Sequence, residues 1–252
     1  MRRYFLEVTY KGTRYSGFQV QTNAITIQSE VEKALTTLFR QPFSLTGSSR
    51  TDAGVHAFQN FFHFDTDIFI RQEQLYNLNA ILPSDIAVKG IYPVENQSHC
   101  RFDAVSREYK YFVYKEKNPF LQETAWYYPF KLDMDILQNA AAIIPGYKDF
   151  TSFSKRNTQV KTFICDIKYS SWAYENDCLV FTVISNRFLR GMVRGLVSTM
   201  FKTARNIISI DQFREIIEQQ DCTKADFAAP PQGLYLVKVN YKDDFLGKVD
   251  NG

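Results

Sequence analysis

The amino-acid sequence predicts an α+β fold made of two α/β subdomains with mostly antiparallel sheets. Segments typical of strands and of helices occur along the whole chain, and they do not alternate strictly. With 252 residues and 45% hydrophobic content, the chain is also long enough for one large domain or two ordinary ones. Counting elements places a boundary near 103–106. We therefore expect subdomains over 1–105 and 106–241, followed by a polar, frayed tail over 242–252.

The first half combines strands with two helices. Residues 3–10 are rich in β-branched and aromatic side chains and stop at a glycine-containing turn, which predicts a strand. Thr26 is a good helix N-cap, and apolar side chains then recur every three or four positions as far as Phe39, which predicts a helix. Pro83 ends a second predicted helix. The other elements expected here are strands over 43–46, 57–64 and 86–94 and that second helix over 71–82.

The second half repeats this mixture. Residues 108–115 alternate tyrosine and valine with lysine, phenylalanine and tyrosine, which predicts a strand that uses both faces. Pro145 and Gly146 end a helix that we expect over 133–144. The remaining predicted elements are strands over 160–170, 178–185 and 234–241 and helices over 188–204 and 211–219.

Composition excludes several classes of protein. The formal net charge is only +3, which by itself does not indicate a nucleic-acid partner. No uninterrupted apolar run approaches the roughly 18 residues of a membrane helix, and Glu7, Lys11 and Arg14 break any signal-peptide core after the basic start. The cysteines have no CxxC spacing, so we expect free thiols and a cytoplasmic location. They are Cys100, Cys165, Cys178 and Cys222.

The loop between the second and third predicted strands carries a candidate catalytic carboxylate, Asp52. It lies two residues after Arg50 and two before Gly54, whose missing side chain lets the backbone approach a ligand. A carboxylate in this position can act as a nucleophile or stabilise a cation. The alternative is a simple turn-forming aspartate. The Gly-Lys-Ser/Thr of a nucleotide-binding P-loop is absent.

The three histidines do not form a metal-binding motif. His56, His63 and His99 lack HxH or HxxxH spacing and lie apart from any cysteine pair. His63 belongs to an aromatic strand, where we expect a hydrogen-bonded structural histidine. A Ser-His-Asp triad remains open, although no GxSxG motif occurs.

Residues 186–210 contain no acidic side chain but several basic ones. On the predicted helix the basic side chains share one arc, and the apolar side chains fill the opposite arc. Such a helix either has an ordinary solvated face or binds an anion such as RNA phosphate. An arginine there could also pair with Asp52 and lower its pKa. The basic residues are Arg187, Arg190, Arg194, Lys202 and Arg205.

Taken together, these segments resemble the TruA family of tRNA pseudouridine synthases. The string RTDAGVHA at 50–57 is similar to the signature of that family. Further matches follow in the order of the family and cover about 3–241. They are YSGFQ at 15–19, NAILPSDI at 79–86, REYKY at 107–111, DFTSF at 149–153, Phe188 with MVR at 192–194, and GLYL at 233–236.

The resemblance implies the pseudouridine synthase fold, with a central catalytic cleft between the subdomains. It implies isomerisation of uridine to pseudouridine in the anticodon stem and loop of tRNA, at tRNA positions 38–40. It also implies a homodimer, with no cofactor, no metal and no membrane partner.

By the same resemblance, Asp52 matches the catalytic aspartate, Arg194 its arginine partner and Tyr109 the tyrosine that packs on the target base. Arg50 matches an arginine that holds the flipped nucleotide. Arg187 and Arg190 are the further residues expected to bind the substrate.

The chain departs from the family pattern at six positions. The family usually has Trp at the position of Phe18 and Gly at the position of Ser49. It usually has Asn where Gly195 stands and Gly where Ser198 stands, and the sequence before Gly195 reads RGMVR rather than HHMVR. The departures bear on which nucleotide is chosen more than on the reaction.

Two other classes of function compete with this interpretation. One is a tRNA-binding or tRNA-folding protein of the same fold that has lost turnover. The presence of Asp52, Tyr109 and Arg194 together favours the enzyme, because a pure binder does not need a buried acid–arginine pair. The other is a glycoside- or phosphate-processing enzyme, which lacks a second well-placed carboxylate.

Overall fold

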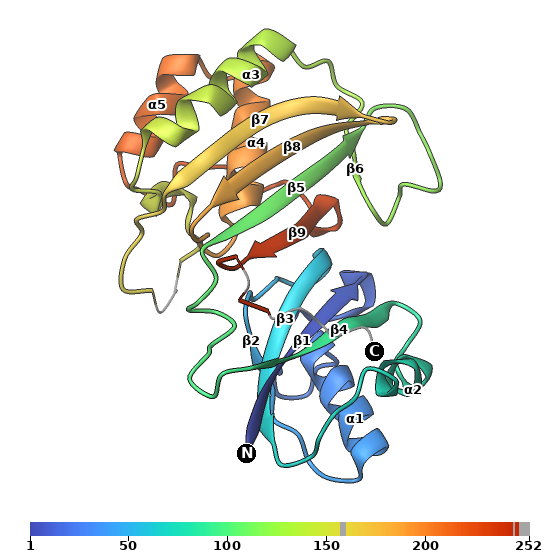
Figure 1. Ribbon diagram of the computed structural model, residues 1–252. Coiled ribbons are helices and arrows are strands. Elements are labelled where there is room, and N and C mark those ends of the chain that lie inside the picture. The colour runs from blue at the N-terminus through green and yellow to red at the C-terminus, as the bar shows by residue number, and fades with distance from the viewer. Residues whose placement is uncertain (157–159, 244, 247–252) are drawn as a thin grey trace. The chain divides into compact units, whose positions relative to one another are not determined.

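The computed structural model describes residues 1–156, 160–243 and 245–246, and it has the mixed α and β architecture predicted from the sequence (Figure 1). The chain divides into two compact units. Unit 1 comprises Met1–Ser106 and the chain from Leu236 onward, and unit 2 comprises Arg107–Tyr235. The last strand, β9 (Leu234–Asn240), begins in unit 2 and ends in unit 1. Most of the tail expected to be frayed, 244 and 247–252, lies outside the described residues.

Unit 1 is built on an antiparallel sheet. Its long strands follow the order β4–β1–β3, and the short β2 pairs with β3. Figure 1 shows two helices, α1 and α2, next to each other beside these strands. The elements are β1 (Arg2–Tyr10), the 3₁₀ turn η1 (Gly12–Arg14), α1 (Ile27–Phe39), β2 (Thr46–Gly47), β3 (His56–Thr66), α2 (Gln74–Ile81) and β4 (Ile86–Val94).

Helix α1 begins where the sequence predicts it. The Thr26 hydroxyl accepts a hydrogen bond from the Ser29 backbone N–H, and the Ser29 hydroxyl accepts one from the Thr26 N–H in return. This capping box satisfies two backbone donors at the helix start. Ile27, Val31 and Leu35 are buried along one face, which holds the helix against its unit.

Two predictions for unit 1 need correction. The strand expected over 43–46 is reduced to β2, which starts only at Thr46 because Gln41–Leu45 has no strand partner. The helix expected over 71–82 is shorter, since Arg71 and Gln72 form a turn before α2 begins. Strand β4 has the predicted bounds.

Unit 2 is also built on antiparallel strands, in the order β5–β8–β7, and β6 adds a short parallel pairing to β5. Figure 1 shows α3 and α5 side by side near β7. The elements are β5 (Ser106–Tyr114), β6 (Trp126–Tyr127), α3 (Met134–Ile143), η2 (Ile144–Gly146), η3 (Thr151–Phe153), β7 (Ile167–Glu175), β8 (Cys178–Ser185), α4 (Met192–Ala204), α5 (Ile210–Glu218) and η4 (Pro231–Gly233).

Aromatic side chains fill the cores of both units. In unit 2, the Phe201 ring of α4 stacks on Trp126 with centroids 5.2 Å apart and lies 5.4 Å from Trp172. In unit 1, the Phe5 ring lies 5.6 Å from that of Tyr241, which follows β9. The high aromatic content is thus largely explained by packing. Among the described residues, no helix is long and apolar enough to cross a membrane.

Candidate active site

A tight turn between β2 and β3 holds Asp52. The Val55 N–H donates to the Asp52 carbonyl oxygen at 3.2 Å, and Gly54 closes the turn with φ of +77°. A residue with a side chain would be strained in that left-handed conformation, which explains the glycine. The Asp52 side chain is half-buried, and Arg50 just before it is exposed. The turn therefore presents a carboxylate and a guanidinium from one short segment.

The segment that follows β1 packs under this turn. The hydroxyl groups of Tyr10 and Thr51 lie 2.8 Å apart and share a hydrogen bond. The Gly12 N–H donates to Nδ1 of the buried His56 at 3.0 Å. A Cβ added at Gly12 would lie only 2.0 Å from the Val55 carbonyl oxygen. The backbones of Gly12 and Val55 are so close that only glycine fits.

Asn60 is a supporting residue that sequence reasoning missed. Its side chain is fully buried on β3, donates to the Ser49 carbonyl oxygen at 2.8 Å and to the Tyr10 hydroxyl at 3.2 Å, and accepts from the Phe61 N–H. A buried amide needs such partners to offset its desolvation. The signal available in the sequence is an Asn inside an aromatic strand. Asn60 fixes the chain just before Asp52 through the Ser49 carbonyl.

The two departures from the family pattern in unit 1 lie around the same turn. The Phe18 N–H donates to the Thr51 carbonyl oxygen at 3.1 Å, and its buried ring stacks on Phe62 with centroids 4.4 Å apart. A Cβ added at Gly47 would lie 2.3 Å from this ring. Ser49 is buried, and its hydroxyl has no hydrogen-bond partner. The Phe18 ring thus packs directly beneath the Asp52 turn.

Unit 2 supplies the other predicted site residues. Tyr109 lies on β5 opposite Val183, is 8% exposed, and meets the Phe188 ring edge-on with centroids 4.9 Å apart. Arg194 lies in the first turn of α4, and its Nε donates to the Ala229 carbonyl oxygen at 2.6 Å. This hydrogen bond orients the guanidinium group within unit 2.

Tyr111 lies on β5, and burial raises the pKa of its hydroxyl well above the usual value. The positive charge of Arg194, on α4, opposes part of this increase. The Tyr111 hydroxyl donates to the Pro230 carbonyl oxygen at 2.7 Å. Arg194 and Tyr111 therefore both hold the segment that contains Ala229 and Pro230.

The long basic helix predicted over 188–204 is wrong at its start. Helix α4 begins at Met192, because Gly191 has the left-handed φ of +76° and Asn186–Leu189 is not helical. Arg187 and Arg190 therefore lie before the helix and do not share an arc with Arg194. Arg187 is half-buried and Arg190 is exposed.

The basic residues at the other end of α4 contact groups within unit 2. Lys202 pairs with Asp226 at 2.8 Å. The Arg205 guanidinium lies 4.5 Å from the centre of the Phe130 ring and donates to the Tyr128 hydroxyl. The acidic partner of Lys202 thus comes from outside 186–210.

The departures on α4 have a packing explanation. A Cβ at Gly195 would lie 2.8 Å from the Phe227 ring and 3.3 Å from the Phe153 ring, so the asparagine usual in the family does not fit this arrangement. Ser198 hydrogen-bonds to Asp226. Burial is the largest single influence on the pKa of Asp226 and raises it, but the hydrogen bonds from Lys202 and Ser198 contribute to a net lowering of that pKa. Both residues serve the contact between α4 and 226–230.

Each unit groups its own candidate residues. Arg50 and Asp52 stand together on the turn of unit 1, whereas Tyr109, Arg187, Arg190 and Arg194 belong to unit 2.

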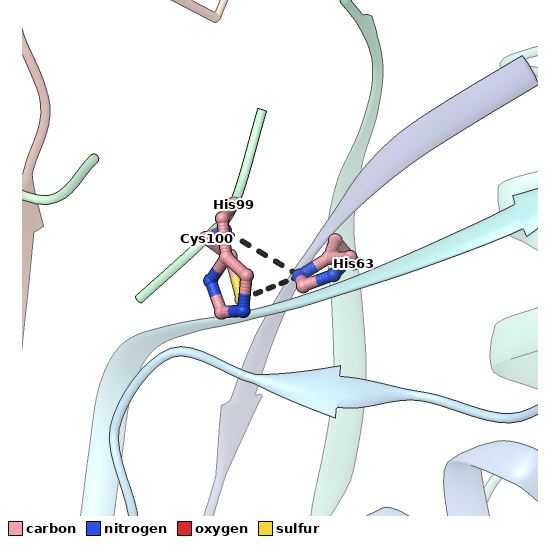
Figure 2. Close-up of side chains that lie close together, drawn as sticks. All are labelled: His63, His99 and Cys100. Carbon is pink, nitrogen blue, oxygen red and sulfur yellow. Dashed lines mark hydrogen bonds between the residues drawn. The ribbon is translucent and has the colours of Figure 1, made fainter. Parts of the chain in front are cut away.

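A cluster of His63, His99 and Cys100 in unit 1 has donor atoms that suit a metal ion. These atoms lie within 4.8 Å of one another (Figure 2). They already have hydrogen-bonding partners, however. Nδ1 of His63 lies 3.1 Å from the Cys100 sulfur and accepts from the Cys100 N–H at 3.4 Å, and the sulfur donates to the Thr46 carbonyl oxygen. The contacts fit the structural histidine predicted at position 63.

His63 should make the stability of the protein depend on pH. Burial, helped by the positive charges of His99 and Arg3, lowers its pKa to about 4 from 6.5. The unfolded chain therefore takes up the proton first as the pH falls. The free energy of unfolding should be fully retained above pH 6.5 and decrease by up to about 3 kcal/mol as the pH falls towards 4. Urea unfolding between pH 4 and pH 7 measures this.

The control is His63→Asn, whose side-chain oxygen can replace Nδ1 as an acceptor but does not titrate. The difference in unfolding free energy between the two proteins should change with pH only in this window. A difference that is constant from pH 7 to pH 4 would contradict the assignment to His63.

Comparisons with known proteins show which proteins the chain is similar to. A family model described as tRNA pseudouridine synthase matches residues 7–103 and 140–242. The chain is 43% identical to tRNA pseudouridine synthase A of Parabacteroides distasonis over 252 residues, covering 98% of both chains. It is 43% identical to the protein of that name from Porphyromonas gingivalis and 35% identical to one from Staphylococcus aureus, covering 98% of this chain and 100% and 94% of those relatives.

Proposed function

This chain belongs to the tRNA pseudouridine synthase family, and we propose that it isomerises uridine to pseudouridine in the anticodon stem and loop of tRNA, with Asp52 as the catalytic carboxylate. The observation that carries the proposal is the tight turn that presents Asp52, braced by Gly12, Thr51 and Asn60. The proposed enzyme works in the cytoplasm and, as the family resemblance implies, as a homodimer.

The reaction needs no external energy source, because one glycosidic bond replaces another. The C1′–N1 bond of the uridine breaks, the base turns, and C5 bonds to C1′. The proton on C5 then leaves, and N1 gains one. The Asp52 carboxylate either attacks C1′ and is later displaced by C5, or assists removal of the C2′ proton. Either path requires an ionised carboxylate beside the sugar of a base that stays enclosed.

The other site residues have distinct roles in this proposal. The target base must leave the stack at a cost of a few kcal/mol, and the Tyr109 ring offsets part of that cost by packing on it. Arg194, whose Nε donates to the Ala229 carbonyl oxygen, is the further catalytic residue of the proposal, as the family resemblance implies. Arg50 holds the flipped nucleotide. Arg187 and Arg190 contact phosphates.

The test uses tRNA transcripts labelled with tritium at C5 of uridine. Isomerisation must release this tritium to water, so the expected result is release that requires the protein and saturates at a small whole number of uridines per tRNA. Absence of release across a complete set of tRNAs, with tRNA binding intact, would contradict the proposal and favour a binding protein of the same fold.

A further inference from the structure

Unit 1 contains a cavity of about 180 Å³ beside the Asp52 turn. One water molecule occupies roughly 30 Å³ of liquid, so a phosphate group or a ribose fits inside, but a whole nucleotide does not. Drug-sized ligands usually occupy at least about 300 Å³. The cavity is therefore suited to one polar part of a larger ligand. Its lining includes Phe18, Gly47, Arg50, His99, Arg101 and Phe102.

The lining is positively charged. Two arginines, Arg50 and Arg101, are among the residues that line the cavity, and none of those residues is acidic. His99 also lines the cavity, and burial lowers the pKa of its imidazole. Arginines beside a small polar cavity suit the binding of a phosphate oxygen.

An exposed aromatic ring stands at the edge of this cavity. Phe102 is 73% exposed, although its ring lies 4.2 Å from that of His99 and 5.8 Å below the Arg101 guanidinium. The His99 ring in turn meets the buried His63 ring edge-on, with centroids 4.5 Å apart, and His63 is hydrogen-bonded to Cys100 (Figure 2). The cluster thus anchors a large apolar ring in a surface position. Exposed rings beside arginine are typical stacking platforms for unpaired bases.

We propose that this cavity and Phe102 bind one nucleotide of the substrate tRNA other than the target uridine. Its phosphate contacts Arg101, and its base stacks on Phe102. The inference rests on the proposed function for the identity of the RNA. Because Arg50 is two residues from Asp52, a nucleotide held here lies close along the strand to the one that reacts.

The chain offers a matched control for the test. Phe69 is 62% exposed in the same unit, and the Arg2 guanidinium lies 5.6 Å from its ring, but neither residue lines the cavity. The variants Phe102→Leu and Arg101→Gln are therefore compared with Phe69→Leu and Arg2→Gln. Thermal unfolding checks that all four fold like the wild type, as expected for surface positions.

The measurement is the Kd of an unmodified tRNA transcript at several salt concentrations. Phe102→Leu should raise Kd by about tenfold, and Phe102→Trp should restore it, because stacking needs an aromatic ring. Arg101→Gln should weaken binding and reduce the salt dependence by about one phosphate contact. The KM for tRNA should rise by the same factor as Kd. Phe69→Leu and Arg2→Gln should match the wild type.

Equal Kd values for Phe102→Leu and Phe69→Leu would overturn the inference, and so would a failure of Phe102→Trp to restore binding. The tritium assay separates this outcome from failure of the proposed function. Tritium release with Phe102-independent binding refutes only the subsite. Phe102-dependent binding without any release supports the subsite and refutes the catalytic proposal.

Discussion

Replacement of Asp52 by Asn should reduce pseudouridine formation by about 10⁴-fold or more, as expected when the single nucleophile or base of a reaction is lost. Asparagine has nearly the same size, but it can neither attack C1′ nor carry the negative charge. The turn itself should persist, because the Val55 N–H bonds to the backbone carbonyl oxygen of Asp52 and not to its side chain. The Kd for tRNA should therefore stay within about twofold of the wild type, as expected for a group that acts in the transition state.

Asp67→Asn is the matched control for this variant. Asp67 is an exposed carboxylate of the same unit that pairs with the N-terminal amino group, far in sequence from the turn. Single-turnover kinetics and equilibrium binding, measured on both variants, separate catalysis from a general charge effect. Turnover by Asp52→Asn at the rate of Asp67→Asn would refute the catalytic role, and equal losses of binding and turnover would indicate a binding role instead.

Replacement of Gly12 by Ala should be the most damaging of the conservative changes in unit 1. The new methyl carbon would lie 2.0 Å from the Val55 carbonyl oxygen, so one of the two backbone segments must move. Overpacking of this kind costs typically 1–3 kcal/mol and sometimes more. Loss of the hydrogen bond from the Gly12 N–H to His56 adds about 1 kcal/mol. We expect the unfolding temperature to fall by about 10 °C, measured by calorimetry.

The same change should lower turnover, since Val55 closes the turn that carries Asp52. Gly146→Ala is the control, because a Cβ there meets nothing within 4 Å. It should shift the free energy of unfolding by less than about 0.5 kcal/mol. If both alanine variants unfolded at the same temperature, the close approach of Gly12 to Val55 would not be an important constraint.

Elements with a local signal were predictable from sequence. The N-cap of helix α1 at Thr26 and its apolar face are both visible in a short stretch of sequence, and the structure confirms both. The strand predicted over 160–170 is wrong, because β7 (Ile167–Glu175) starts seven residues later. Its position follows from the two-residue turn at Asn176 and Asp177, where Asn176 has φ of +51° and Glu175 pairs with Cys178. Asparagine tolerates the positive φ that a two-residue hairpin turn requires.

The predicted start of α4 was wrong for a different reason. Apolar periodicity from Phe188 onward is compatible with a helix, but Gly191 adopts a left-handed conformation that interrupts it. Almost every position of α4 is buried, so the helix does not have the basic face that the sequence predicted. Lys202 pairs with Asp226, and Arg205 lies over the Phe130 ring. Such pairings join distant parts of the chain and leave no periodic trace in the sequence.

The candidate site was predictable only where a short motif carries it. The string at 50–57 identified Asp52 and its turn. The residues that brace the turn, Gly12 and Asn60, depend on the register of β1 against β3, which pairs Tyr10 with Ala57 and Val8 with Asn60. The approach of His99 to His63 likewise joins a loop to a strand 36 positions earlier in the chain. Spacing rules do not detect such contacts.

The most direct test of the proposed function is to map pseudouridine at nucleotide resolution in a complete set of unmodified tRNA transcripts after incubation with the wild type and with Asp52→Asn. We predict new pseudouridine confined to the anticodon stem and loop with the wild type and none with Asp52→Asn. Pseudouridine elsewhere in the tRNA, or equal modification by the two proteins, would contradict the proposal that Asp52 isomerises uridine at that place.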